Sequence, residues 1–153
     1  MSESPVRRFG PGFRWGSVDV LHYKRDADAP FRDVTRQTLF RRDDLAGELR
    51  YFEVAAGGHT TLERHEHTHA VMVLRGHGRC LVGTEVHAIG PFDLVAIAPL
   101  TWHQFRAAPG EPLGFLCMVD AARDRPQLPD AQALRELRAD ERIRAFLDEM
   151  NAG

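Results

Sequence analysis

The sequence has few of the features that would assign it at once to a class of protein. Only two of its 153 residues are cysteines, Cys80 and Cys117, too few for the disulfide framework of a small secreted domain. It has no apolar run of about 18 residues, the length that a transmembrane helix needs. The opening residues, MSESPVRRFGPGF, lack the apolar segment of a secretory signal. We therefore expect a cytoplasmic protein with no membrane partner.

Charge of one sign is not in excess either. Twenty Lys and Arg residues oppose 22 Asp and Glu residues, so the formal net charge is −2. Proteins that bind nucleic acid present a basic stripe, so we expect no nucleic-acid partner. Apolar residues make up 43% of the chain and charged residues 27%. This composition and length are typical of a single globular domain.

Histidine is the residue in unusual supply. Six of the eight histidines lie between His59 and His87, and a seventh is His103. They are densest in the run from His65 to His69, which follows Gly57–Gly58. Neutral imidazole is the commonest metal ligand in proteins, and a carboxylate often joins it. The pattern therefore predicts a metal site in this segment.

The chain divides into three parts. Residues 1–33 are rich in Gly, Pro and Arg and predict an irregular arm with one short strand near residues 17–23. Residues 34–120 alternate short β-forming segments with Gly, Pro and Asp turns, which predicts an all-β sandwich or small barrel. The expected strands are Val34–Phe40, Leu49–Ala55, Thr60–His65, His69–Arg75, Arg79–Val82, Glu85–Ile89, Leu94–Ala98, Trp102–Ala107 and Leu113–Val119.

Residues 121–153 change in character. They begin with a proline-containing linker and continue with apolar residues at helical spacing. We expect two short helices, or one helix interrupted near Asp140, with Asp130 and Asp140 as N-caps. The apolar face of these helices has to be covered by the β-domain or by a second subunit.

The geometry of strands leaves two ligand sets open in the histidine-rich segment. Side chains two residues apart on a strand share a face and start about 6.6 Å apart, so Glu63 pairs with His65, or His65 pairs with His67. In the second case one residue would have to reverse the chain before His69, which is too short for a hairpin. We favour Glu63, His65 and His69, with residues 66–68 as the turn and His67 as the alternative ligand.

The same residues resemble the first sequence motif of the cupin superfamily. The run Gly57-x5-Glu63-x-His65-x3-His69-x6-Gly76 has the spacing of that motif, with the glutamate and one histidine exchanged. The resemblance implies a jelly-roll β-barrel, the double-stranded β-helix of the cupins, with short C-terminal α-helices added here. It also implies that the metal is held inside this barrel.

A weaker second motif adds a fourth ligand. His103 opens a predicted strand after Pro99, in the setting of the second cupin motif. The chain is similar to small bacterial manganese cupins, in which a cysteine placed like Cys117 faces the metal cavity. The resemblance thus implies one divalent transition metal ion per chain, Mn or Fe before Zn, Ni or Co. The predicted ligands are Glu63, His65, His69 and His103.

The predicted function follows from the open positions of such an ion. Four protein ligands leave room on an octahedral ion for substrate and O2, which favours a metal-dependent dioxygenase acting on a small organic molecule. The alternatives are a binding protein without turnover, such as a sensor or scaffold, and a non-redox isomerase or lyase. The side chains expected to line the cavity are Phe52, Val71, Val73, Phe105 and Cys117.

The expected partners are a small-molecule ligand and a second copy of the chain. Cupins usually form dimers, and both ends of this sequence carry apolar residues that need to be covered. The residues that support the dimer are Phe9, Phe13, Trp15, Phe146 and Leu147.

Overall fold

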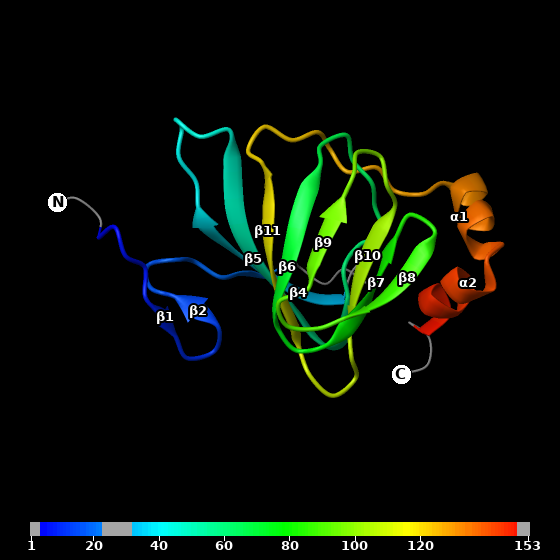
Figure 1. The fold of residues 1–153 in the computed structure, drawn as a ribbon, viewed down its shortest axis with the longest axis horizontal. Helices are drawn as coiled ribbons and strands as arrows, with labels where there is room; N and C mark the ends of the chain where they lie inside the picture. Colours follow the sequence, from blue (N-terminus) through cyan, green and yellow to red (C-terminus); the bar gives the residue numbers. More distant parts are fainter. Residues whose placement is uncertain (1–3, 23–31, 150–153) are drawn as a thin grey trace.

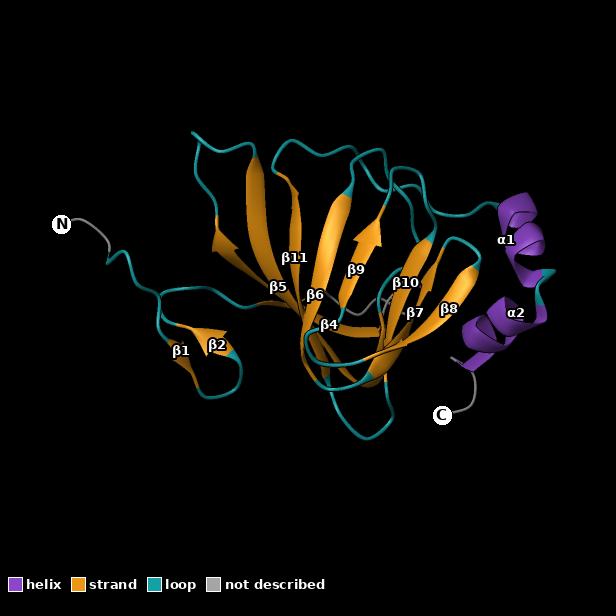
Figure 2. Cartoon of the chain, viewed as in Figure 1, coloured by secondary structure: helices purple, strands orange, loops and turns teal. Residues whose placement is uncertain are grey.

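The computed structural model describes residues 4–22 and 32–149. Nearly half of these residues lie in β-strands, and two helices follow at the C-terminal end (Figures 1 and 2). The prediction of an all-β domain with short C-terminal helices is confirmed. The strands are β1 (Phe9–Gly10), β2 (Arg14–Trp15), β3 (Leu21–His22), β4 (Arg32–Phe40), β5 (Gly47–His59), β6 (His69–Arg75), β7 (Gly78–Val82), β8 (Glu85–Ile89), β9 (Leu94–Ile97), β10 (His103–Ala107) and β11 (Leu113–Asp120). The helices are α1 (Ala131–Arg138) and α2 (Glu141–Asp148).

One antiparallel sheet carries the fold. Its strand order is β8-β7-β10-β5-β11-β6-β9, with β4 added on β5 and β3 added on β4. Figure 2 shows that this sheet curls around its inner face, as a strongly twisted sheet does when it approaches closure. The 13-residue strand β5 pairs with β4, β11 and β10 and so connects the two sides of the curl.

The side-chain alternation of β5 and β11 determines what lies inside the curl. Phe52 and Val54 on β5 and Phe115 and Cys117 on β11 point to the inner face, where they join the main hydrophobic core. Arg50 lies at the next inward position of β5 and is also buried. The inner face is therefore apolar toward one end of these strands and charged toward the other.

The predicted strands agree with the structure except around residues 57–65. His69–Arg75 and Glu85–Ile89 match to the residue. The predicted strand Thr60–His65 is wrong, because this segment makes only isolated β-bridges at Glu63 and Arg64. The predicted turn at Gly57–Gly58 is also wrong, since both glycines lie within β5. Gly57 has φ +72°, which lets the long strand bend without ending.

The C-terminal segment forms two helices whose caps match the prediction. The Asp130 carboxylate accepts a hydrogen bond from the Ala133 N–H at 2.8 Å, and the Asp140 carboxylate accepts from the Arg142 N–H at 2.8 Å. The apolar faces of α1 and α2 form a second core cluster together with residues of the β-domain. Its buried members are Leu62, Leu81, Leu137, Ile143, Phe146 and Leu147.

The N-terminal arm packs on the outer face of the sheet. A small hairpin of β1 and β2 places Phe13 and Trp15 against Tyr51, with ring centroids 5.8 and 5.1 Å apart. Of the expected strand near residues 17–23, only Leu21–His22 forms a strand, β3, which pairs with β4, and residue 23 lies outside the described residues. Within the described part of the chain, neither helix is long and apolar enough to cross a lipid bilayer.

This packing removes most of the basis of the dimer prediction. Phe146 and Leu147 are buried within their own chain, and Phe13 and Trp15 pack on Tyr51. Among these residues only Phe9 is largely exposed. The dimer itself stays a prediction.

Candidate metal centre

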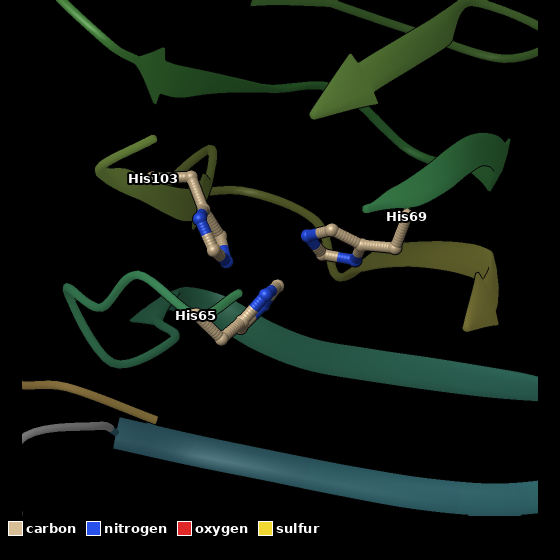
Figure 3. A group of neighbouring side chains, drawn as sticks. All are labelled: His65, His69 and His103. Atoms are coloured by element: carbon tan, nitrogen blue, oxygen red, sulfur yellow. The ribbon is translucent and has the colours of Figure 1, made fainter. Parts of the chain in front are cut away.

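Three of the four predicted ligands gather at one place. His65 lies in the loop after β5, His69 is the first residue of β6, and His103 is the first residue of β10. Each offers a ring nitrogen, and these nitrogen atoms all lie within 4.8 Å of one another. Figure 3 shows the three rings pointing toward one another from separate segments of the chain. This spacing suits ligands of one ion.

The path of the chain differs in part from the predicted one. The predicted turn is present, because the chain bends at Glu66 and His67 before β6 begins. However, β6 does not pair with the segment that carries Glu63, as we expected from a hairpin. It pairs with β9 and β11, whereas Glu63 forms a bridge with His103. The ligands therefore converge across the curl of the sheet.

Backbone carbonyl groups fix the orientation of two of the rings. The Nδ1 atom of His65 lies 2.9 Å from the His67 carbonyl oxygen, and that of His103 lies 2.9 Å from the Thr101 carbonyl oxygen. Because a carbonyl only accepts, each Nδ1 must carry the proton and donate it. The lone pair of each neutral ring is then on Nε2. Hydrogen bonds of this kind are typical behind metal-binding histidines.

The ring of His69 provides the test of whether the site fits a metal ion. Its Nδ1 lies 3.2 Å from the Cys117 sulfur, while its buried Nε2 has no hydrogen-bond partner among the described residues. A buried polar atom without a partner is costly. A divalent ion would satisfy this nitrogen together with the imidazoles of His65 and His103. The donor set thus fits the predicted metal.

The electrostatic setting keeps the three imidazoles neutral. Burial lowers the pKa of His69 to about 3 and that of His103 to about 4. Burial also lowers the pKa of His65. Only the neutral imidazole can ligate a metal, so at neutral pH these rings are in the form that binding requires.

Glu63, the fourth predicted ligand, lies in the same cavity but apart from the compact group. Its carboxylate is not among the ligand atoms that lie within 4.8 Å of one another. Burial raises the pKa of Glu63 to about 7. Its role as a ligand therefore stays a prediction.

His67, the alternative ligand, is engaged elsewhere. Its Nδ1 lies 2.7 Å from an Asp124 carboxylate oxygen, and its ring stacks on His65 at a centroid distance of 3.7 Å. The Glu66 N–H also donates to Asp124, which lowers the pKa of that carboxyl to about 2. His67 thus supports the ring of His65 and lies outside the group of three.

The candidate ligands line a cavity of about 340 Å³. Four of the five predicted wall residues contribute to it, namely Phe52, Val71, Phe105 and Cys117. Val73 does not line the cavity. It is fully buried in the hydrophobic core, paired with Phe115 on β11, and Phe115 faces the cavity instead.

Cys117 lies within the cavity wall and in contact with a candidate ligand. Its sulfur is the partner of His69 Nδ1. In the sheet, Cys117 pairs with Val71 on β6 and with Arg50 on β5. Burial raises the pKa of the thiol to about 12, and the carboxylates of Glu63 and Glu48 contribute to that rise. Cys80 is also buried but does not line this cavity.

Three arginines that were not predicted from the sequence line the same cavity, namely Arg36, Arg50 and Arg123. The alternation of β5 was the signal that could have identified one of them. Arg50 is two residues from Phe52, which we expected to point inward, so it belongs to the same face. No local pattern brings Arg36 and Arg123 to this place, because their positions depend on how β4 and the segment after β11 meet β5.

Comparison with known proteins adds three findings. The family model described as "Cupin domain" matches residues 50–119. The chain is 57% identical over 146 residues to the 1-methylthio-D-xylulose 5-phosphate methylsulfurylase of Rhodospirillum rubrum. The matched region covers 95% of this chain and 94% of that protein. Two crystal structures are also similar. One is a cupin 2 conserved barrel domain protein from Rhodopseudomonas palustris, with 59% identity, a TM-score of 0.90 and coverage of 92% and 97% of the two chains. The other is a cupin-2 domain protein from Rhodospirillum rubrum, with 56% identity, a TM-score of 0.88 and coverage of 96% and 99%.

Proposed function

The chain belongs to the cupin superfamily, and from this premise we propose that it is a metal-dependent methylsulfurylase. Its substrate in this proposal is 1-methylthio-D-xylulose 5-phosphate, the compound in the name of the R. rubrum relative. The observation that carries the proposal is that the Cys117 thiol and the three imidazoles share one cavity. A thiol side chain can accept a methylsulfanyl group by forming an S–S bond. The word methylsulfurylase in the relative's name describes transfer of such a group.

The structure of the substrate explains why an ion and a thiol belong together. The methylsulfanyl group is attached to C1, next to the ketone carbon of xylulose. When the C1–S bond breaks, its electron pair can be delocalised into the neighbouring carbonyl as an enolate. When bound, a divalent ion supplies positive charge that stabilises the developing enolate oxygen and favours the thiolate form of Cys117.

Cys117 then has a definite role. Its thiolate attacks the sulfur of the methylsulfanyl group, so that an S–S bond forms as the C1–S bond breaks. The electron pair of the C1–S bond goes to the enolate, which takes up a proton at C1. Cys117 is left as a methyl disulfide, which a second thiol cleaves by ordinary thiol–disulfide exchange. The Nδ1 of His69, at 3.2 Å, holds the sulfur in place.

The dioxygenase predicted from the resemblance is the second candidate. Its support is the group of three imidazoles beside an apolar wall that contains Phe52, Phe105 and Phe115. Such a wall excludes water and suits a small organic ligand. Dioxygenase chemistry has no use for the thiol, so Cys117 distinguishes the two candidates.

A direct assay tests the proposal. Protein reconstituted with Mn(II) or Fe(II) is incubated with 1-methylthio-D-xylulose 5-phosphate and a small thiol, under argon and in air. We expect the methylsulfanyl group to be lost at the same rate under argon and in air. NMR and mass spectrometry measure this loss. Oxygen consumption in step with turnover would favour the dioxygenase. Binding without turnover would favour a sensor or scaffold, and conversion without loss of sulfur would favour an isomerase or lyase.

A further inference from the structure

The cavity that contains the candidate metal centre also contains a group of arginines. Arg36 on β4, Arg50 on β5 and Arg123 after β11 all line it. Cavity walls are usually apolar with a few well-placed polar groups. Three guanidinium groups in one such cavity are therefore unusual and require a physical reason.

A buried glutamate holds two of these arginines. The Glu48 carboxylate accepts hydrogen bonds from the Arg50 Nε–H and, at 2.9 Å, from an Arg123 Nη1–H. The Glu48 side chain is only 3% exposed, Arg50 is 10% exposed and Arg123 is 26% exposed. A guanidinium group carries several N–H donors, so one donor used on Glu48 leaves others for a ligand.

The charges do not balance within the group. Glu48 contributes one negative charge, while Arg50 and Arg123, the two arginines bound to it, contribute two positive charges. Two other carboxyl groups line the cavity: Glu63, whose segment bridges to His103 beside the imidazole group, and Asp124, whose carboxylate is bound to His67 and the Glu66 N–H. The surplus of positive charge matches a phosphate monoester, which carries about −1.5 to −2 at neutral pH.

The register of the strands sets the distance between the Arg50 guanidinium group and the thiol. Arg50 is the cross-strand neighbour of Cys117, and Glu48 is the neighbour of Val119. The Arg50 side chain runs back along β5 to Glu48. Two residues along a strand correspond to about 6.6 Å. The guanidinium group is thus displaced from the sulfur by a distance of the order of a five-carbon chain.

We propose that Arg36, Arg50 and Arg123 form the phosphate subsite of the cavity, with Glu48 as the positioning residue that holds Arg50 and Arg123 in place. This inference rests on the proposed function. The phosphate of a ketose 5-phosphate binds at the arginines. C1, at the other end of the substrate, then lies beside Cys117 and the imidazole group. Arginine suits this role because its planar donors match phosphate oxygens in pairs.

Binding of inorganic phosphate tests the subsite without requiring turnover. Calorimetric titration is carried out with the whole protein and with Arg36→Gln, Arg50→Gln and Arg123→Gln. Loss of a charge-assisted contact should weaken phosphate binding about ten- to hundredfold in each variant. Arg144→Gln, which changes an exposed arginine on α2, is the matched control and should bind as the wild type does.

Two further variants separate the subsite from misfolding and from phosphate binding at the metal. Arg50→Gln leaves Glu48 buried without one of its partners, which destabilises the fold, so Glu48→Gln/Arg50→Gln removes both charges together. His69→Ala should keep phosphate binding, because the subsite does not use the imidazole group. Phosphate binding that is lost in His69→Ala but unchanged in the arginine variants would place the anion at the metal and overturn the proposal.

Kinetics separate this inference from the proposed function. Wild type should prefer the phosphorylated substrate to 1-methylthio-D-xylulose, and the arginine variants should lose that preference mainly through a raised KM. If neither compound is turned over but phosphate binding still depends on the three arginines, the proposed function fails and the subsite stands. If turnover occurs with the same preference in all variants, the subsite is wrong and the proposed function stands.

Discussion

The Nδ1 atom of His69 lies 3.2 Å from the Sγ atom of Cys117. This contact connects the candidate metal centre to a thiol in the wall of the same cavity. The buried Nε2 of the same ring has no hydrogen-bond partner among the described residues. One residue is thus placed to bind an ion through one nitrogen and to orient a sulfur atom through the other.

Alanine substitution should separate the ligands from their neighbours. Metal content should collapse in His65→Ala, His69→Ala and His103→Ala, because each removes one of the three converging nitrogens. His67→Ala should retain most of the metal, with affinity reduced about 10- to 100-fold, since it only supports the ring of His65. Elemental analysis after reconstitution measures this. His87→Ala, which changes an exposed histidine on β8, is the control. Metal loss in His67→Ala equal to that in His65→Ala would contradict the assignment.

The pH dependence of metal binding should show whether Glu63 is a ligand. Its carboxyl has a pKa of about 7, so below that pH a proton must leave before the oxygen can bind the ion. Affinity for Mn(II) should therefore fall about tenfold per pH unit below neutrality in the wild type. In Glu63→Gln this slope should vanish until the solution is acidic enough to protonate the imidazoles. The pKa values of His69 and His103 are lowered to about 3 and 4, so this requires a strongly acidic solution. Equal slopes in both proteins would show that Glu63 does not bind the metal.

The two cysteines should respond differently to substrate. Cys117 lines the cavity and Cys80 does not, although both are buried. Without a second thiol, the wild type and Cys80→Ser should gain the mass of one methylsulfanyl group in place of the thiol proton. Cys117→Ser should gain none, because a hydroxyl does not form a stable bond to that sulfur. Intact-protein mass spectrometry measures the gain. An adduct on Cys117→Ser would exclude Cys117 as the acceptor.

A glycine at the start of β7 should be needed to position β10. A Cβ atom at Gly78 would overlap the carbonyl oxygen of Arg106 on the neighbouring strand. Gly78→Ala should therefore lower the free energy of unfolding by at least about 2 kcal/mol, because backbone rather than a flexible side chain has to move. Gly110→Ala is the control, since nothing lies within 4 Å of the added carbon. Urea denaturation compares them, and equal midpoints would contradict the prediction.

A homodimer is still predicted, but other residues now support it. Met72 and Leu94 are neighbours across β6 and β9 on the outer face of the sheet, and Met118 is exposed on β11 beside them. Exposed apolar side chains grouped in this way often mark an interface. We expect a dimeric mass by light scattering at micromolar concentration, reduced to that of a monomer in Met118→Glu. A monomeric wild type would contradict the prediction.

The sequence by itself determined the local elements and much of the candidate metal centre. Alternating β-forming residues predicted most strands, and Asp130 and Asp140 predicted the starts of both helices, because these signals depend only on neighbouring residues. The spacing of His65 and His69, together with His103, matched a known motif. Those three histidines meet in the structure.

Only the tertiary structure decided how these elements share one cavity. Side-chain alternation shows which residues share a face of one strand, but it does not show which other strand lies opposite. The pairing of β11 with both β5 and β6 brings Cys117 between Arg50 and Val71, and the curl of the sheet brings Arg36 and Arg123 to the same space. The same folding covered Phe146 and Leu147 within the chain and placed Val73 in the core. Contacts between residues far apart in sequence depend on the pairing of whole strands, so a local pattern could not predict them.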